Sequence, residues 1–93
     1  MPGDYEYRTL DFTDTFLATY AGREFSDKER RLFRKALRLL DEDERHPSLR
    51  VHKLQGDRAG AWSAAASDPL RITFERSSSG RKRLLTSSRH YGD

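Results

Sequence analysis

The chain has 93 residues with a formal net charge of +3, and 35% of its residues are charged against 34% that are hydrophobic. A chain of this length buries only about 60–65% of its unfolded surface, so we expect one small domain over residues 1–93. The same length excludes a dinucleotide-binding fold and a large internal cavity. No apolar run reaches the ~18 residues of a membrane span, and the lack of cysteine excludes disulfides and thiolate zinc sites. No signal peptide is evident after Met1, so we expect the protein in the cytoplasm.

Basic residues are concentrated in the last two thirds of the chain. Residues 1–27 carry two basic and six acidic residues, whereas residues 28–50 carry eight basic and five acidic, and residues 51–93 eight basic and four acidic. Such a surplus favours a polyanion or an acidic protein as the partner. Lysines and arginines that only solvate helix and strand faces would give the same counts, so charge leaves both interpretations open.

The N-terminal part of the chain predicts a strand and a first helix. Tyr5–Leu10 is aromatic with rough alternation, which predicts a short strand at the edge of a sheet. Asp11 or Thr13 can cap a helix that follows and that Gly22 ends. The apolar residues of this helix share one face and are Phe12, Phe16, Leu17 and Tyr20.

A second helix has the clearer start. Ser26 and Glu29 have the capping-box pattern, in which the serine hydroxyl accepts from a helical N–H and the glutamate accepts from the serine N–H. One apolar stripe follows, made of Leu32, Phe33, Ala36, Leu37 and Leu40. The four acidic residues 41–44 are unfavourable at a helix C-terminus because of the helix dipole, so we expect fraying there, with Pro47 ending the helix.

After Leu49 the helical period is lost and strands are predicted. The clearest is Leu70–Arg76, whose period of two separates Leu70, Ile72 and Phe74 from Arg71, Thr73 and Glu75. The other segments are an alternating stretch Val51–Leu54, a turn Gly56–Gly60, a strand Ala61–Ser67, a hairpin loop Ser77–Gly80 and a last strand Arg81–Ser88. The order β-α-α-β-β-β predicts an α+β fold, with two helices packed on a small antiparallel sheet.

Several short segments, in this order and spacing, resemble the RelE/ParE superfamily of type II toxin–antitoxin toxins over about residues 5–91. They are the helix positions Phe33, Ala36, Leu37 and Leu40, the stretch HPSLRVHKLQG at 46–56, GAWS at 60–63, the strand LRITF at 70–74 and the terminal Arg89-His90-Tyr91. The His-Tyr pair is similar to the end of the YoeB-type branch.

The resemblance implies a toxin that stops translation by cutting mRNA on the ribosome, with no metal ion or cofactor. In that reaction the RNA 2′-hydroxyl attacks the phosphate and leaves a cyclic phosphate, which needs a base, an acid for the leaving 5′-oxygen and a cation beside the phosphorane. Carried over to this chain, Arg71 is the cation, and His90 and Tyr91 are the acid–base and orienting pair. The residues expected to contact RNA are Lys53, Arg89, Arg34 and Arg38.

The resemblance also implies a cognate antitoxin as the protein partner, with operator DNA bound only through it. The sequence is compatible with such a partner, since Leu84 and Leu85 on the last strand and the basic surplus suit an acidic amphipathic helix.

Each candidate residue has a plainer interpretation. Arg71 can be a solvated strand arginine, the terminal pair can pack or fray, and the arginines of the second helix can form a solvated face. If residues 51–54 form a strand, His52 and Lys53 face opposite sides, and we favour Lys53 for RNA. Trp62 is expected to pack in the core or on the sheet rather than to stack on a base.

Two departures from the YoeB-type pattern keep other functions open. Residues 64–66 are alanines where that branch carries basic residues, and Pro47 and Ser48 occupy the place of its acidic base. The alternative is therefore a non-catalytic protein of the same fold that holds an antitoxin and, with it, operator DNA. A gyrase-poisoning toxin of the ParE kind is less favoured, because that branch does not need the terminal His-Tyr pair.

Overall fold

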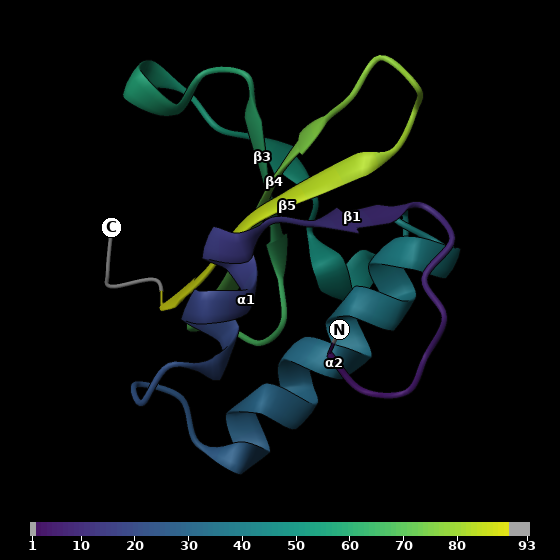
Figure 1. The fold of residues 1–93 in the computed structure, drawn as a ribbon. Coiled ribbons are helices and arrows are strands. Elements are labelled where there is room, and N and C mark those ends of the chain that lie inside the picture. The colour runs from purple at the N-terminus through teal and green to yellow at the C-terminus, as the bar shows by residue number, and fades with distance from the viewer. Residues whose placement is uncertain (1, 90–93) are drawn as a thin grey trace.

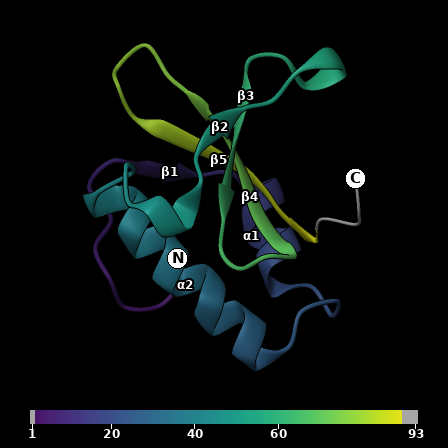
Figure 2. The ribbon, with the colours of Figure 1, turned by 180° about the vertical axis from the view of Figure 1, so that it is seen from behind.

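The structure is a computed structural model that describes residues 2–89. One five-stranded sheet has the strand order β1-β5-β4-β3-β2. Its strands are β1 (Leu10–Phe12), β2 (His52–Lys53), β3 (Ala61–Ala65), β4 (Leu70–Arg76) and β5 (Lys82–Arg89). The helices are α1 (Asp14–Ala21) and α2 (Asp27–Glu42), with two short 3-10 turns, η1 (Pro47–Leu49) and η2 (Gly56–Arg58). Figures 1 and 2 show α2 on one side of the sheet.

The predicted α+β fold is confirmed, with two corrections to the sheet. A short strand β2 pairs antiparallel with β3 and brings the number of strands in the described residues to five. The first strand pairs parallel with β5 and not antiparallel, with Leu10 opposite Lys82. β5 also contains a bulge, because Thr73 pairs with Thr86 while Phe74 pairs with Leu84, and Leu85 is the extra residue.

The first strand begins at Leu10, so its prediction over Tyr5–Leu10 is wrong in its bounds. The backbone N–H groups of Arg8 and Thr9 donate to the Asp41 carboxylate, at 2.7 to 3.1 Å, and not to a neighbouring strand. Since these donors are occupied by a side chain, regular strand pairing starts only after them.

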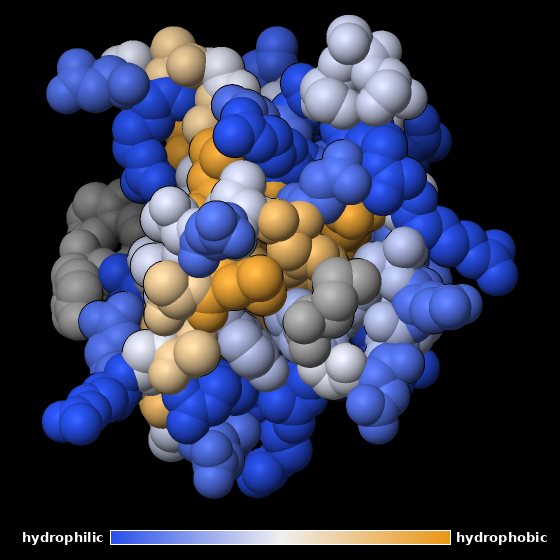
Figure 3. Space-filling model, viewed as in Figure 1, coloured by the Kyte–Doolittle hydropathy of each residue, from blue (hydrophilic) through white to orange (hydrophobic). Residues whose placement is uncertain are grey.

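Thr13, one of the two residues predicted to cap α1, is its N-cap. The Thr13 hydroxyl accepts from the Phe16 N–H at 3.0 Å, and Gly22 is the C-cap as predicted. Phe12 lies on β1 and not on the helix, where it was expected. The apolar face of α1 is only partly covered: Phe16 is buried and Leu17 is half-buried, and Figure 3 shows apolar residues at the centre of this side of the molecule, over α1.

The capping box predicted at the start of α2 is present. Ser26 Oγ accepts from the Glu29 N–H at 3.1 Å, and Glu29 Oε1 accepts from the Ser26 N–H at 2.9 Å. The predicted stripe is buried from Phe33 to Leu40, with Leu32 only half-buried. The helix ends at Glu42, before Pro47, which instead opens η1.

Asp41 corrects the expectation of fraying at this end of α2. It is only 9% exposed and accepts from the N–H groups of Arg8 and Thr9 and from Thr9 Oγ1. Burial raises the pKa of Asp41, but the hydrogen bonds from Thr9 and Arg8 outweigh it and hold the pKa below its usual value. These donors satisfy a charge that would otherwise be unfavourable at a helix C-terminus.

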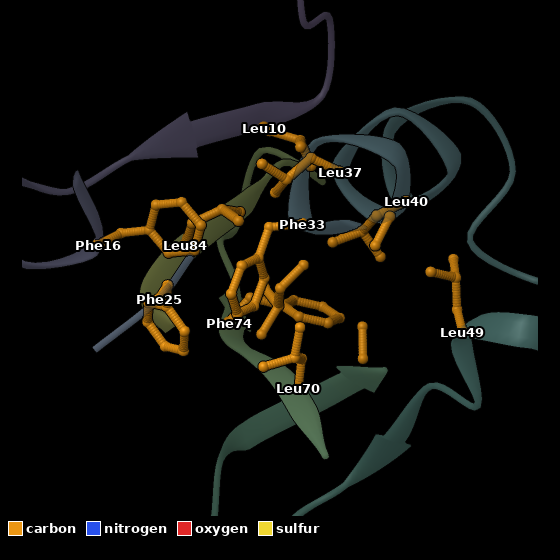
Figure 4. Packing of buried hydrophobic residues seen from close by; sticks show 13 residues of the cluster. Leu10, Phe16, Phe25, Phe33, Leu37, Leu40, Leu49, Leu70, Phe74 and Leu84 are labelled. Carbon is orange, nitrogen blue, oxygen red and sulfur yellow. The ribbon is translucent and has the colours of Figure 1, made fainter. Parts of the chain in front are cut away.

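The core lies between α2 and one face of the sheet (Figure 4). The apolar face predicted for β4 is buried there, because Leu70, Ile72 and Phe74 are each 1% exposed or less. Trp62 packs against this core, as expected, with its ring stacked 6.5 Å from that of Phe74. The opposite face of β4 is therefore free of the helices and available for polar side chains.

We predict that Asp41→Ala lowers the free energy of unfolding by about 2–3 kcal/mol, because it leaves the part-buried N–H groups of Arg8 and Thr9 without their acceptor. Chemical denaturation followed by circular dichroism measures this loss. Asp43→Ala, at an exposed position two residues on, is the control and should cost less than about 1 kcal/mol. Equal losses in the two variants would contradict a special role for Asp41.

Candidate functional site

The sheet face opposite α2 carries a row of hydroxyl groups. Strand register places Ser63 beside Thr73 and Thr73 beside Thr86, so one hydroxyl comes from each of β3, β4 and β5. Ser88 lies on the same face, opposite Arg71. We call this surface the hydroxyl face. Ser63 and Thr73 are each only 5% exposed, whereas Thr86 and Ser88 are half-buried. The hydroxyls of Thr86 and Ser88 are therefore the ones that can donate to or accept from a ligand above the sheet.

Two arginines border the hydroxyl face. Arg58, in η2, donates through Nη2 to Thr73 Oγ1 at 3.0 Å, and Figure 1 shows η2 extending away from the side of the sheet that α2 covers. Arg71 is half-buried, and its Nη1 donates to the carbonyl oxygens of Ser67 at 2.6 Å and Leu70 at 3.1 Å. Within residues 2–89 neither arginine forms an ion pair with a carboxylate, so both charges can act on an anion.

A hollow of about 360 Å³ lies beside Arg58 on this face. Its polar lining includes Thr73, Thr86 and two acidic residues, Asp57 and Glu75. Glu75 forms an ion pair with Arg83 at 2.7 Å, which neutralises the single acidic group of β4. Arg58 and Asp57 both line the hollow, and Arg71 adds a positive charge on this face.

The short strand β2 separates His52 from Lys53. His52 pairs with Ser63 and so shares the hydroxyl face, whereas Lys53 pairs with Trp62 and shares the other face. Lys53 Nζ lies 5.4 Å from the Trp62 ring centroid. The structure therefore brings His52, and not the favoured Lys53, to the face that carries Arg71. The reason is that the face of each residue in a two-residue strand is decided by its pairing with β3.

His52 has a defined ring orientation. Its Nδ1 lies 2.9 Å from the carbonyl oxygen of Arg50, so Nδ1 donates and Nε2 is left as the acceptor in the neutral ring. The side chain is exposed. An accessible imidazole nitrogen on the face that carries Arg71 can accept a proton.

Arg89 points to the α2 side of the sheet. It pairs with Leu70, and its guanidinium donates to both carboxylate oxygens of Glu29, at 2.7 and 3.1 Å, and to the Glu24 carbonyl at 3.0 Å. The hydrogen bonds from Arg89 and then from the Ser26 backbone lower the pKa of Glu29 to about 2. Arg89 thus joins the end of β5 to the start of α2, and its predicted contact with RNA stays a prediction.

The remaining predicted residues do not gather at the hydroxyl face. Arg34 and Arg38 lie on α2, where Arg34 donates to the Tyr20 hydroxyl at 2.8 Å and Arg38 lies over the Tyr5 ring at 5.1 Å. His90 and Tyr91 lie outside the described residues, so their roles stay predictions. In residues 2–89 no group of three potential metal ligands occurs, and no helix is long and apolar enough to cross a membrane.

Sequence reasoning missed Arg58 and the row of hydroxyls. Arg58 lies in a stretch that indicates only a turn, and nothing local shows that the turn folds back toward Thr73. The row depends on the pairing of Ser63, Thr73 and Thr86, which come from three strands. The one available signal was Thr73, which alternation places on the same face of β4 as Arg71.

The same fold occurs in solved toxin structures. A YoeB/ParE toxin from Agrobacterium tumefaciens is 21% identical with a TM-score of 0.70, and covers 90% of this chain and 100% of its own. The DinJ–YafQ toxin–antitoxin complex from E. coli is 15% identical with a TM-score of 0.67, covering 91% and 94%. The YoeB–YefM complex from Staphylococcus aureus is 15% identical with a TM-score of 0.61, covering 88% and 95%.

These likenesses confirm the resemblance at the level of the fold. No protein-family model and no curated protein matches the chain. At such identities the shared arrangement of helices and strands is what the comparison establishes, and chemistry has to be argued from the side chains.

We predict that the link between Glu29 and Arg89 makes stability depend on pH. Because the folded-state pKa of Glu29, about 2, lies below the ordinary value of 4.5, its contribution is complete above pH 4.5 and is lost as the pH falls toward 2. As the pH falls from 4.5 toward 2, the melting temperature of Glu29→Gln should therefore drop less than that of the wild type. Circular dichroism measures both. Glu6→Gln, at an exposed position, should follow the wild type; an unchanged slope in Glu29→Gln would contradict the link.

Proposed function

We propose that the protein is the toxin of a type II toxin–antitoxin system and that it acts as a metal-independent endoribonuclease on ribosome-bound mRNA in the cytoplasm. The observation that supports this most is the hydroxyl face, where Arg58 and Arg71 form no ion pair with a carboxylate within residues 2–89. The likeness of the fold to YoeB and YafQ toxins supports the same proposal.

In the proposed reaction, the RNA 2′-hydroxyl attacks the adjacent phosphate and the 5′-oxygen leaves with a proton. Arg71 places its guanidinium beside the phosphate and stabilises the negative charge of the phosphorane. His90 serves as the acid–base group, and Tyr91 orients it or the phosphate. His52, with Nε2 free to accept a proton, is a second candidate for the base, since no acidic side chain fills that role in the sequence.

A cognate antitoxin is the proposed protein partner, with DNA bound only through it and the ribosome as the site of action. Solved structures of this fold include the DinJ–YafQ and YoeB–YefM toxin–antitoxin complexes. A small acidic protein that covers Arg58 and Arg71 would prevent RNA from reaching the hydroxyl face.

A non-catalytic binding protein is the second candidate, and one observation favours it. Ala65 pairs directly with Arg71, so a methyl group stands where a neighbouring cation would strengthen the hold on a phosphate. Such a protein would still hold an antitoxin and, with it, operator DNA.

Induced expression in a bacterial host tests the proposal. We expect growth arrest with cleaved transcripts, and cleavage slowed by about 10²-fold or more in Arg71→Ala and in His90→Ala. Primer extension on ribosome-bound mRNA from purified components measures the cleavage. The matched control is Arg45→Ala, which removes an exposed arginine from the loop between α2 and η1, outside the hydroxyl face. Cleavage by this variant should be unchanged.

Other outcomes point elsewhere. A purified protein that leaves ribosome-bound mRNA intact while binding an antitoxin would favour the non-catalytic candidate. DNA breaks with induction of the SOS response would indicate a gyrase poison instead.

A further inference from the structure

A cavity lies away from the hydroxyl face, between the N-terminal segment and α2. Its volume is about 700 Å³, and its lining runs from residues 2–7 to the outer side of α2, from Arg31 to Glu42. Figure 1 shows the N-terminal segment, in purple, looping beside α2 on the side away from the sheet. We call this cavity the helix groove.

The floor of the helix groove is apolar and well fixed. It is formed by Pro2, Tyr5, Tyr7 and Leu39. The Tyr7 hydroxyl donates to the Pro2 carbonyl at 3.0 Å, and the Tyr5 and Tyr7 rings meet edge to face at 4.8 Å. Burial raises the pKa of Tyr7 to about 12, so the hydroxyl stays protonated as a donor. Such a floor suits an apolar or aromatic side chain of a ligand.

The wall of the helix groove is a row of cations on α2. Arg31, Arg34, Lys35 and Arg38 lie three and four residues apart, which places them on one side of the helix. None of them forms an ion pair with a carboxylate of residues 2–89. Half of the other fourteen lysines and arginines in residues 2–89 do form one, namely Arg30, Arg50, Arg76, Arg81, Lys82, Arg83 and Arg89. Four cations without an ion pair to residues 2–89 therefore lie side by side along one cavity.

Two carboxylates at the groove distinguish between possible anions. Asp4 and Glu42 both line it, together with the cations. A nucleic-acid strand carries a charge on every nucleotide, so a strand that runs along the groove brings phosphates next to these carboxylates. A peptide can place its own carboxylates against the arginines and leave uncharged residues beside Asp4 and Glu42.

We propose that the helix groove binds an acidic amphipathic peptide segment of a partner protein, with an apolar side chain on the tyrosine floor and carboxylates against Arg31, Lys35 and Arg38. This role goes beyond the proposed endonuclease and does not depend on it. It assigns Arg38 to a protein partner and not to RNA, while Arg34 lines the same groove and donates to Tyr20. The groove and the hydroxyl face lie on opposite sides of the core, so both can be occupied at once.

Fluorescence anisotropy with the full chain tests the proposal. The probe is a labelled synthetic peptide of glutamate and leucine with one central phenylalanine, and a labelled oligouridylate of equal charge is the comparison. The groove variant is Arg31→Ala with Lys35→Ala, two exposed residues. The matched control is Lys28→Ala with Arg45→Ala, which removes the same charge from exposed residues outside the groove.

We expect the peptide to bind, with its affinity reduced about tenfold in the groove variant and less than about twofold in the control. Replacing the phenylalanine with serine should weaken binding to the wild type, because the floor is apolar. The proposal would be overturned if the peptide did not bind or if both variants lost the same affinity for it. It would also be overturned if the oligouridylate bound more tightly than the peptide and the groove variant no longer bound it. Circular dichroism of each variant shows that it is folded, and no outcome depends on RNA cleavage.

Discussion

The carboxylate of Asp41 holds the N-terminal segment, which forms one side of the helix groove, to α2. It binds Arg8 and Thr9 through their N–H groups, and Thr9 Oγ1 in turn accepts from Lys82 Nζ at 2.9 Å. α2, the N-terminal segment and β5 therefore meet at one nearly buried polar cluster. This cluster fixes where β1 begins to pair with β5, and it lies next in sequence to Tyr7 and Glu42, which line the helix groove. A polar anchor of this kind is directional, whereas apolar contacts alone would let the segment slide.

The basic residues that have no ion pair lie on two separate surfaces, and alternation along the strands is one reason for this separation. On β4, apolar side chains face α2 while Arg71 and Thr73 face the other side, so the sheet itself keeps the cations of the hydroxyl face apart from the core. The cations of α2 lie on the far side of that helix. Between these surfaces, carboxylates neutralise most of the remaining arginines. A net charge of +3 thus conceals two positive surfaces that face different partners.

The features that could be predicted from sequence are those decided within a few residues. The capping box at Ser26 and the strand Leu70–Arg76 depend on local hydrogen bonds and on alternation, and both are present. The features that could not be predicted depend on distant partners. The strand expected from Tyr5 starts late because Asp41, more than thirty residues away, takes its donors. Lys53 lies on the α2 side of the sheet because it pairs with Trp62. The sequence of a two-residue strand does not show which residue of a neighbouring strand it will pair with.

The bulge at Leu85 decides which side of the sheet receives the last arginine of β5. Counting strictly by twos from the buried Lys82 puts Arg89 on the hydroxyl face, the same face as Arg71 and away from Glu29. The one extra residue reverses that parity, so Ser88 takes the place beside Arg71 and Arg89 reaches Glu29. A single irregular position in the ladder therefore exchanges the two faces for Thr86–Arg89, and this exchange is what lets the last described arginine of the sheet fasten the start of α2.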